Sequence, residues 1–257
     1  MEETPLITPS RFLSLEGIAR ADNPCTAAVI AFCPFHGMKD LAHARPLEKP
    51  LFVHVDRSHQ FQGIVEGRRV LMVECVYGGP VCATVIEEMA HLGVKHVIGY
   101  GYSGSLREAI VPGTIVLASS GTVSDGASRE YLDAPEVEGS AALMAAFDTL
   151  DGSLRAGVRT GRAWTTDAIY REYPSKIQSW IQAGADFVNM DTSHFYAVSQ
   201  AVGIEALYFS LISDYVGGET WDQQFRDLQK PRERLQKIIL ELIPLIPVRA
   251  DERQEVS

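Results

Sequence analysis

The sequence predicts an α/β fold with three layers, a central mixed and largely parallel β-sheet flanked by helices. Two observations predict it. Short apolar runs that fit buried strands alternate with stretches of helical periodicity. The stretch 231–243 near the C-terminus carries apolar residues at the spacing of a helix packed on a core. We expect one domain over residues 1–257, with an extended N-terminal segment over 1–25 and a frayed tail over 248–257.

The composition favours a soluble, acidic protein. Of the 257 residues, 46% are hydrophobic and 22% are charged, and the net charge is −10. No Lys/Arg block is long enough to follow a phosphate backbone, so we expect no nucleic-acid partner. The chain shows neither a signal-peptide core near Met1 nor a membrane span, which needs roughly 18 apolar residues, so we expect no membrane partner and a cytoplasmic location. The four cysteines form no C-x-x-C pair and are expected to be free thiols.

In the first half of the chain, strand-like and helix-like stretches alternate. Strands are expected at 26–33, 51–55, 61–65, 69–76 and 94–100, and helices at 38–44 and 83–92. Glu66-Gly67 joins two of these strands in the manner of a hairpin. Gly93 ends the second helix. After the last of these strands we expect a glycine-rich turn, Gly101 to Ser105.

The second half continues the alternation. Strands are expected at 114–119, 155–164 and 205–212, and helices at 136–149, 175–183, 231–243 and after Asp191. Pro231 suits the first turn of the last helix, and Pro244 ends it. Ligands in α/β sheets bind beyond the carboxyl ends of strands. The polar or glycine-rich loops after Val76, Tyr100 and Ile212 are therefore expected to converge on one pocket.

Two carboxylates stand at the ends of expected elements. Asp191 follows a short apolar run where a helix should begin, and Asp214 ends the apolar strand 205–212. Functional residues are often placed on such loops and caps. A purely structural role stays open for each: Asp191 suits a helix N-cap, and Asp214 suits a turn cap before Gly217.

Several segments, in order, resemble those of one enzyme family. They are VEGRRVLMVECVYGGPVCATVIEEMAHLGVKHVIGYGYSGSL, VPGTIVLASSGTVSDGAS, TTDAIYRE, VNMDTSHFYAVSQAVGIEAL and ISD. Together they resemble the nucleoside phosphorylase superfamily, which contains purine nucleoside and uridine phosphorylases and related nucleosidases. The similarity covers about residues 26–243. It implies a nucleoside phosphorylase-like fold, a small-molecule nucleoside as partner, no cofactor, and a homo-oligomer that is a dimer, trimer or hexamer.

The resemblance implies a role for each carboxylate. Met190-Asp191 stands at the family's Met-Glu pair, whose glutamate accepts hydrogen bonds from ribose hydroxyls, although Asp is one methylene shorter. Asp214 stands at the acid that protonates or hydrogen-bonds N7 of a purine base as the glycosidic bond breaks. A carboxyl half-buried at a strand end can hold that proton near neutral pH. We therefore expect Asp214 to be catalytic, and Met190 and Asp191 to contact the sugar.

Other residues stand where the family contacts phosphate, ribose and base. Tyr102 and Ser103 match the glycine loop that contacts phosphate and ribose, or else form a plain strand-to-loop turn. The predicted base contacts are Trp164, Thr166, Ile169 and Tyr170. Core packing is the alternative for these residues. Tyr173 and Ser175 stand where uridine phosphorylases read uracil, and with Asp214 this favours a purine-like base.

The acceptor side departs from the phosphorylases of the family. They carry one arginine where this chain has Gly99, and another in the loop where it has 33–37, Cys-Pro-Phe-His-Gly. An arginine fork binds two phosphate oxygens, so these losses slightly favour water over phosphate as the acceptor. His36 either positions that water or acceptor, or is a surface histidine of the loop. His194, one helical turn after Asp191, either faces the pocket or is a semi-buried core residue.

The sequence therefore predicts an enzyme that cleaves the N-glycosidic bond of a nucleoside with a purine-like base, by hydrolysis or by phosphorolysis. The alternative is a non-catalytic or repurposed nucleoside-binding protein with the same fold. The departures at Gly99, Gly37 and Asp191 are what loss of the chemistry would produce. No two histidines have the spacing of metal ligands, so no metal site is expected.

Overall fold

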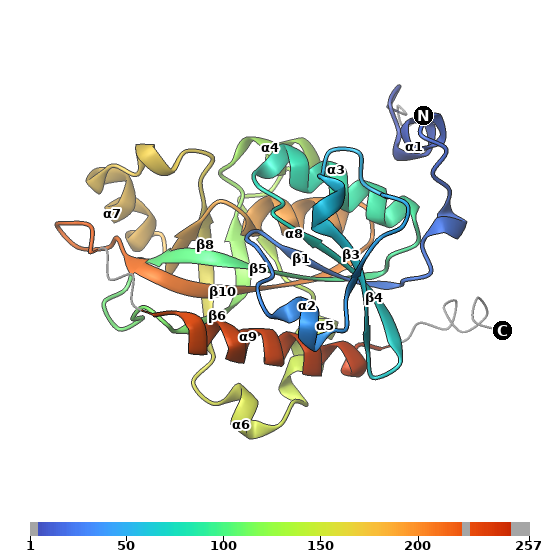
Figure 1. Ribbon diagram of the computed structural model, residues 1–257. Helices are drawn as coiled ribbons and strands as arrows, with labels where there is room; N and C mark the ends of the chain where they lie inside the picture. The colour runs from blue at the N-terminus through green and yellow to red at the C-terminus, as the bar shows by residue number, and fades with distance from the viewer. Residues whose placement is uncertain (1–4, 223–226, 248–257) are drawn as a thin grey trace.

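The computed structural model describes residues 5–222 and 227–247, which form three layers (Figure 1). The strands are β1 (Ala27–Ala31), β2 (Arg45–Pro46), β3 (Gln60–Val65), β4 (Arg68–Glu74), β5 (His96–Ser105), β6 (Ile115–Thr122), β7 (Glu136–Glu138), β8 (Arg159–Thr165), β9 (Phe187–Asn189) and β10 (Glu205–Tyr215). The helices are α1 (Pro9–Leu15), α2 (Met38–Leu41), α3 (Gly79–His91), α4 (Gly126–Tyr131), α5 (Ala141–Asp148), α6 (Gly152–Arg155), α7 (Pro174–Gln182), α8 (Thr192–Ala201) and α9 (Gln229–Leu242). Helices α3, α4 and α8 cover one face of the sheet, and α2, α5 and α9 cover the other (Figure 1). The predicted fold class is confirmed.

The middle of the sheet is parallel, and this aligns the strand ends. β1 pairs in parallel with β4 and β5, and β5 pairs in parallel with β10. The β3–β4 hairpin and the β10–β6 and β5–β9 pairs are antiparallel, so the sheet is mixed, as predicted. Because β10 pairs with both β5 and β6, the strands β5, β9, β8, β6 and β10 close into a ring. The carboxyl ends of β1, β4, β5 and β10 therefore meet at one edge.

Two apolar cores hold the layers together. The core on the α3 and α8 side contains Val97, Phe195 and Tyr208, and the core on the α9 and α5 side contains Ile98 and Tyr100. Successive side chains of a strand point to opposite faces of the sheet. Strand β5 therefore contributes to both cores in alternation, and this alternation decides which residues of β5 face α8.

The glycine-rich turn predicted for Gly101 to Ser105 is wrong, because β5 continues through it. Strand β10 pairs with β5 as far as Tyr215 opposite Ser105, so these backbone groups are bonded as a strand. Glycine is needed at 101 for close approach. A Cβ atom there would lie 2.5 Å from the hydroxyl of Tyr208.

The strand predicted at 51–55 is also wrong. The amide oxygen of buried Gln60 accepts hydrogen bonds from the backbone N–H groups of Leu51 and Phe52, at 2.8 and 3.0 Å. Its amide nitrogen donates to the carbonyl oxygens of Phe52 and Val55, at 2.8 Å each. One side chain thus replaces the partners that a neighbouring strand would supply, and the apolar segment stays a loop.

Two predicted elements begin later than expected. The first residues of the predicted helix 136–149 form β7, which pairs with β6, and α5 begins only after Ser140. The Ser140 hydroxyl accepts a hydrogen bond from Leu143 N–H at 3.1 Å, as a helix N-cap does. The predicted strand 155–164 starts as the end of α6, and β8 begins at Arg159.

The N-terminal segment is not extended throughout. Helix α1 begins after Thr8, whose hydroxyl accepts a hydrogen bond from Arg11 N–H, and it buries Leu13. A capping threonine followed by a proline is a signal for the start of a helix. The polar composition of the segment suggests an extended chain instead. The predicted tail 248–257 lies outside the described residues.

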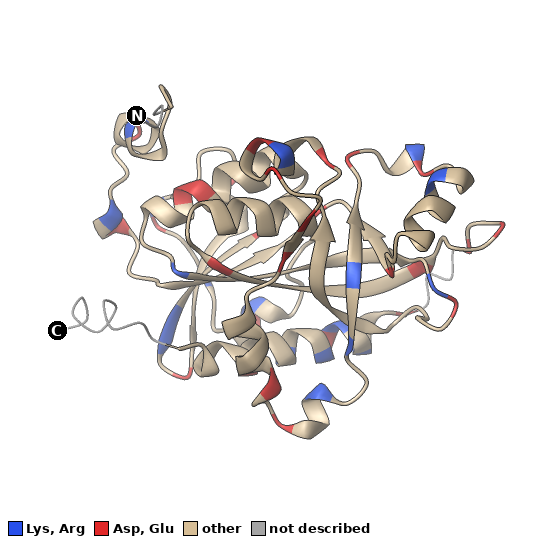
Figure 2. Ribbon diagram, turned by 180° about the vertical axis from the view of Figure 1, so that it is seen from behind, with Lys and Arg blue, Asp and Glu red and all other residues tan. Residues whose placement is uncertain are grey.

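Acidic and basic residues are interspersed around the ribbon, mostly outside the centre of the sheet (Figure 2). All four cysteines are free thiols, as predicted: Cys25, Cys33, Cys75 and Cys82. Among the described residues, no helix combines the length and the apolar character that crossing a membrane requires.

Candidate functional site

The carboxyl ends of the parallel strands bring several predicted site residues together. Asp191 lies between β9 and α8, Ser103 lies near the end of β5, and Asp214 lies near the end of β10. Asp214 is opposite Gly104, in a stretch where the β5–β10 register shifts. The loops after β4, β5 and β10 therefore reach the same edge of the sheet, and their convergence on one pocket stays a prediction.

The carboxyl group of Asp191 is turned into the core. Its Oδ2 atom accepts a hydrogen bond from the Tyr208 hydroxyl at 2.9 Å, and the residue is only 7% exposed. Asp191 is the N-cap residue of α8 by position, as one alternative predicts, but its side chain makes no capping hydrogen bond. Asn189 Oδ1 instead accepts the backbone N–H groups of Asp191 and Thr192. Within residues 5–222 and 227–247, the other oxygen, Oδ1, accepts no hydrogen bond. Burial raises the pKa of Asp191 to about 7, while His194 and the Tyr208 hydroxyl act to lower it.

Aromatic rings fill the space beside Gly99 and Gly101 of β5. A Cβ atom at Gly99 would lie 2.8 Å from Phe195 Cζ and 2.9 Å from Tyr208 Cδ2. A Cβ atom at Gly101 would lie 2.5 Å from the Tyr208 hydroxyl and 2.9 Å from Asp191 Oδ2. An arginine at position 99 would therefore collide with both rings. Sequence reasoning missed Tyr208, although a tyrosine inside a buried apolar strand signals a hydroxyl that needs a partner.

The loop after β1 is anchored on both sides. Phe35 N–H donates a short hydrogen bond to Glu74 Oε2, and Gln236 of α9 donates to the Phe35 carbonyl at 2.6 Å. Glu74 Oε1 lies 3.1 Å from Lys39 Nζ and 3.2 Å from His59 Nδ1. Burial of Glu74 opposes its ionisation, but these hydrogen bonds outweigh burial and hold its pKa below the ordinary value. A buried carboxylate from the end of β4 is therefore bonded to this loop.

His36 lies on this loop and is exposed. Its backbone φ is 51°, in the left-handed region that residues other than glycine seldom adopt. Partial burial lowers the pKa of His36, and the positive charge of Arg232 lowers it further. A neutral imidazole held at this edge can accept or donate a hydrogen bond, which is what positioning a water requires.

Asp214 is half-buried, and its own surroundings bind both of its oxygens. Ser213 Oγ donates to Oδ1 at 2.6 Å, and Trp221 Nε1 donates to Oδ2 at 2.8 Å. Ser213 Oγ also lies 3.2 Å from the Ser103 carbonyl oxygen, so the structure links predicted Ser103 to Asp214. Burial, and then the charge of Asp214, raise the pKa of Glu172 to about 7. No sequence pattern predicted that Glu172 and Trp221 lie near Asp214, because the packing of loops brings them there.

Other predicted residues lie apart from these groups. Tyr102 packs with the core on the α9 side, whereas Gly101 beside it faces Asp191. Trp164 is 1% exposed and stacks on Trp180, with ring centroids 5.8 Å apart.

The remaining predicted base contacts differ among themselves. Thr166 is buried, and its N–H donates to the Asn189 carbonyl at 2.9 Å. Ile169 and Tyr170 are 55% and 95% exposed. Their roles as base contacts stay predictions.

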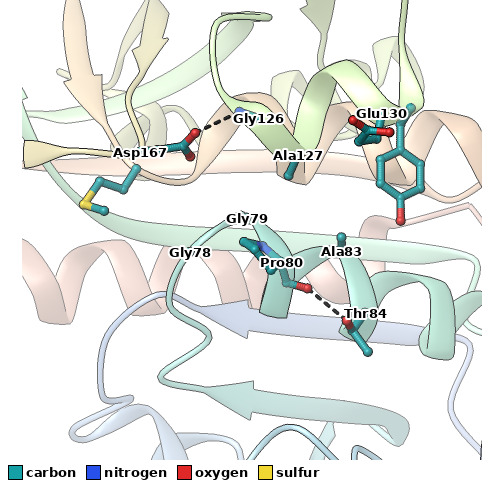
Figure 3. Close-up of a pocket in the computed structure, with 11 residues that line it drawn as sticks. Gly78, Gly79, Pro80, Ala83, Thr84, Gly126, Ala127, Glu130 and Asp167 are labelled. Carbon is teal, nitrogen blue, oxygen red and sulfur yellow. Dashed lines mark hydrogen bonds between the residues drawn. The ribbon is translucent and has the colours of Figure 1, made fainter.

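A groove of about 820 Å³ lies between the start of α3 and α4 (Figure 3). It is lined by Gly78, Gly79, Pro80, Ala83, Thr84, Gly126, Ala127, Glu130, Tyr131, Asp167 and Met190. Asp167 Oδ2 accepts a hydrogen bond from Gly126 N–H at 2.8 Å, which ties the loop after β8 to α4 (Figure 3). The predicted sugar contact Met190 therefore borders an open space, and Asp191 lies next to it in the chain.

His194 is completely buried on α8, which agrees with the core alternative. Its ring lies behind Gly79, because a Cβ atom at Gly79 would come 3.3 Å from His194 Nδ1. Gly79 lines the groove, so the imidazole lies close to the groove without lining it.

Known proteins resemble this chain in sequence and in fold. The sequence pattern of the family described as "Phosphorylase superfamily" matches residues 26–244. An uncharacterized protein of Acanthamoeba polyphaga mimivirus is 33% identical over 88% of this chain and 90% of its own length. A DeoD-type purine nucleoside phosphorylase of Caldanaerobacter subterraneus is 27% identical over 71% of this chain and 79% of its own length.

Solved structures show the same fold at low identity. Purine nucleoside phosphorylase from Toxoplasma gondii, in complex with immucillin-H, has a TM-score of 0.75 at 18% identity and covers 99% of both chains. Uridine phosphorylase from Vibrio fischeri has a TM-score of 0.73 at 20% identity, covering 87% of this chain and 93% of its own. With the family pattern over residues 26–244, these findings establish that the chain belongs to the phosphorylase superfamily.

Proposed function

We propose that this chain cleaves the N-glycosidic bond of a nucleoside with a purine-like base, and that water is the acceptor. One observation carries the choice of water. The rings of Tyr208 and Phe195 fill the space beside Gly99, where phosphorylases of the family carry an arginine for phosphate. A phosphate dianion needs such charge-assisted bonds to offset the loss of its hydration.

Carboxylates of the chain itself oppose phosphate at two further places. Asp191 Oδ2 lies beside Gly101, and Glu74 Oε2 accepts the Phe35 N–H of the loop that the family uses for phosphate. Like charges in a partly buried site repel strongly, because little water screens them. Water carries no charge and needs no cationic cradle. His36 is the group that we assign to orient it.

The base side supports a leaving group that takes up a proton. When the bond breaks, its electron pair goes to the base, and an acid that donates a proton stabilises that charge. We assign this role to Asp214, whose carboxyl oxygens accept hydrogen bonds from Ser213 and Trp221. Glu172, with its pKa raised to about 7 by burial and by the charge of Asp214, holds a proton close to neutral pH. A purine-like base agrees with the purine nucleoside phosphorylases among the relatives.

The sugar side supplies the complementary charge. Bond cleavage leaves positive charge on the sugar carbon, and the ionised form of Asp191 stabilises it while Oδ1 accepts a sugar hydroxyl. Water then adds to that carbon and loses a proton, which replaces the proton that the acid gave to the base. The products are the free sugar and the free base. Met190 contributes an apolar wall at the groove.

The test is a nucleoside panel with and without phosphate. Inosine, adenosine, guanosine, uridine and methylthioadenosine are incubated with the protein, and free base, free sugar and sugar phosphate are quantified. We expect release of the purine bases at a rate that does not depend on phosphate, with label from ¹⁸O-water at the sugar carbon. Formation of sugar phosphate would overturn hydrolysis. Binding of nucleosides without any release would favour the non-catalytic nucleoside-binding protein.

A further inference from the structure

The groups that surround Asp191 include a buried acid–imidazole pair. Asp125 and His194 have side chains that are both 0% exposed, and His194 Nδ1 lies 3.5 Å from Asp125 Oδ1. This distance is within ion-pair range but is longer than an ordinary hydrogen bond. Within the described ranges 5–222 and 227–247, neither ring nitrogen of His194 makes a hydrogen bond. A fully buried imidazole without such bonds is costly, which calls for a reason beyond packing.

We infer that Asp125 and His194 form a positioning pair that holds the Asp191 carboxyl in its ionised, hydrogen-bond-accepting form beside the substrate groove. The inference rests on the proposed function, since it concerns the sugar-side carboxylate of that same site. His194 touches no substrate in it, and acts through Asp191.

The helix geometry places the imidazole correctly for this role. Asp191 immediately precedes α8, and His194 is the third residue of the helix, so the two stand three apart and share one helix face. His194 contributes an electrostatic interaction that favours the ionised form of Asp191. Asp125 is a second carboxylate within ion-pair distance of the same ring. His194 therefore interacts electrostatically with two carboxylates, Asp125 and Asp191.

Hydrogen bonds from Ser128 fix the carboxyl group of Asp125. It is the N-cap of α4, where its Oδ1 accepts Ser128 N–H at 2.9 Å and its Oδ2 accepts the Ser128 hydroxyl. Burial opposes the ionisation of Asp125, but contact with His194 and the bonds from Ser128 outweigh it, and its pKa lies below the ordinary value. Helix caps are usually at the surface, so a completely buried one indicates a partner inside the protein.

The remaining titratable groups that interact with Asp191 stay neutral over the useful pH range. Burial raises the pKa of Cys33, after β1, and of Tyr77, after β4, to about 12. It also raises the pKa of Cys82 on α3 and of Tyr208 on β10 well above their ordinary values. A titration of Asp191 between pH 5 and 9 therefore responds to the Asp125–His194 pair and to none of these four side chains.

The first experiment replaces the imidazole. In His194→Gln, we expect the acidic limb of the kcat/KM profile to move to higher pH by about one unit, since an opposite charge is lost. Activity at pH 6 then falls about tenfold, while activity at pH 9 stays within about twofold of the wild type. Equal loss at both pH values, with the limb unmoved, would show a merely structural role and overturn the inference.

The second experiment keeps the helix cap. Asp125→Asn retains a side-chain oxygen that can accept Ser128 N–H, so α4 keeps its N-cap. This variant therefore tests the pair even if His194→Gln does not fold. We expect the same direction of shift as in His194→Gln. The double variant should add nothing to the His194→Gln shift, because Asp125 acts only through the ring. An additive shift would contradict the pair.

A substrate-free titration separates this inference from the proposed function. Carboxyl resonances of ¹³C-labelled aspartate are followed against pH, with Asp191→Asn used for assignment. We expect the midpoint of Asp191 near 7 in the wild type, and at higher pH in both pair variants. A midpoint unmoved in both variants overturns the inference, whatever the enzyme does. If the midpoint moves but no nucleoside is cleaved, the proposed function fails and the pair stands.

Ser199→Ala is the matched control for these measurements. Ser199 lies on the same helix and is almost equally buried, and its hydroxyl donates to the Phe195 carbonyl at 2.6 Å. We expect its loss to leave the Asp191 midpoint unchanged.

Discussion

Asp191 and Asp214 lie at the same edge of the sheet, in opposite surroundings. Asp191 is 7% exposed, and its neighbours are aromatic rings, thiols and one imidazole. Asp214 is half-buried and takes its hydrogen bonds from a serine hydroxyl and an exposed tryptophan. Strand β10 serves both, since Tyr208 in its middle binds the first and Ser213 near its end fixes the second.

The difference indicates where this chain departs from the phosphorylases of its family. At the buried end, aromatic rings and carboxylates occupy the space that arginine and phosphate would need. Around Asp214, the surroundings are polar. Under the proposed function, the acceptor side has changed while the base side has not, and this favours a new acceptor over a loss of chemistry.

The largest expected effect is on the rate of base release, at Asp214. Asp214→Asn should lower base release by about 10² to 10⁴-fold, since the leaving base then lacks its acid. Its thermal midpoint should stay near that of the wild type, because the side chain is half-buried and not part of the core. Steady-state release of purine base and a thermal scan measure the two effects.

Glu219→Gln is the control for that variant, because Glu219 is an exposed acid on the loop after β10. Its activity should equal that of the wild type. If Asp214→Asn releases base at an unchanged rate, the catalytic assignment of Asp214 is refuted.

The next effect is on stability, at the buried position beside Asp191. Gly101→Ala places a Cβ atom 2.5 Å from the Tyr208 hydroxyl and 2.9 Å from Asp191 Oδ2. We expect a loss of about 1–3 kcal/mol in the free energy of unfolding, as overpacking of a rigid core produces. Urea unfolding measures it.

Gly152→Ala on α6 is the matched control for Gly101→Ala. A Cβ atom at Gly152 meets nothing within 4 Å, so its stability should change by less than about 0.5 kcal/mol. Equal stability of the two variants would mean that the aromatic rings beside β5 move aside at little cost in free energy. The collision argument against an arginine at Gly99 would then fail.

The last effect is the pH dependence of stability. Burial raises the pKa of Asp191 to about 7 in the folded state, against about 3.9 in an unfolded chain. Its contribution to stability is therefore fully present below about pH 4 and is lost as pH rises through 7. In Asp191→Asn, we expect the fall in unfolding free energy between pH 5 and pH 8 to shrink by about 2–3 kcal/mol.

Urea unfolding at the two pH values measures that change. Glu88 and Glu172, whose pKa values burial also raises to about 7, leave part of the slope in place. Asp133→Asn, at an exposed acid, should keep the whole slope. An undiminished slope in Asp191→Asn would mean that Asp191 is not the buried acid described above.

Much of the fold could be predicted because its signals are local. The hairpin around Glu66-Gly67 and the periodic helix 231–243 appear close to their predicted places, as β3–β4 and α9. The errors arose where a distant group replaced a local partner. Gln60 bonds the backbone that would otherwise form a strand at 51–55, and β10 keeps the glycines after Tyr100 in a strand.

The candidate site divides in the same way. The sequence by itself determined that Asp191 and Asp214 stand at element ends, and that no arginine stands at Gly99, because these depend on residue type and order. Only the tertiary structure decided what each carboxyl group meets. Contacts with Tyr208, His194 or Trp221 depend on strand register, helix packing and loop path, which join parts of the chain that share no local pattern.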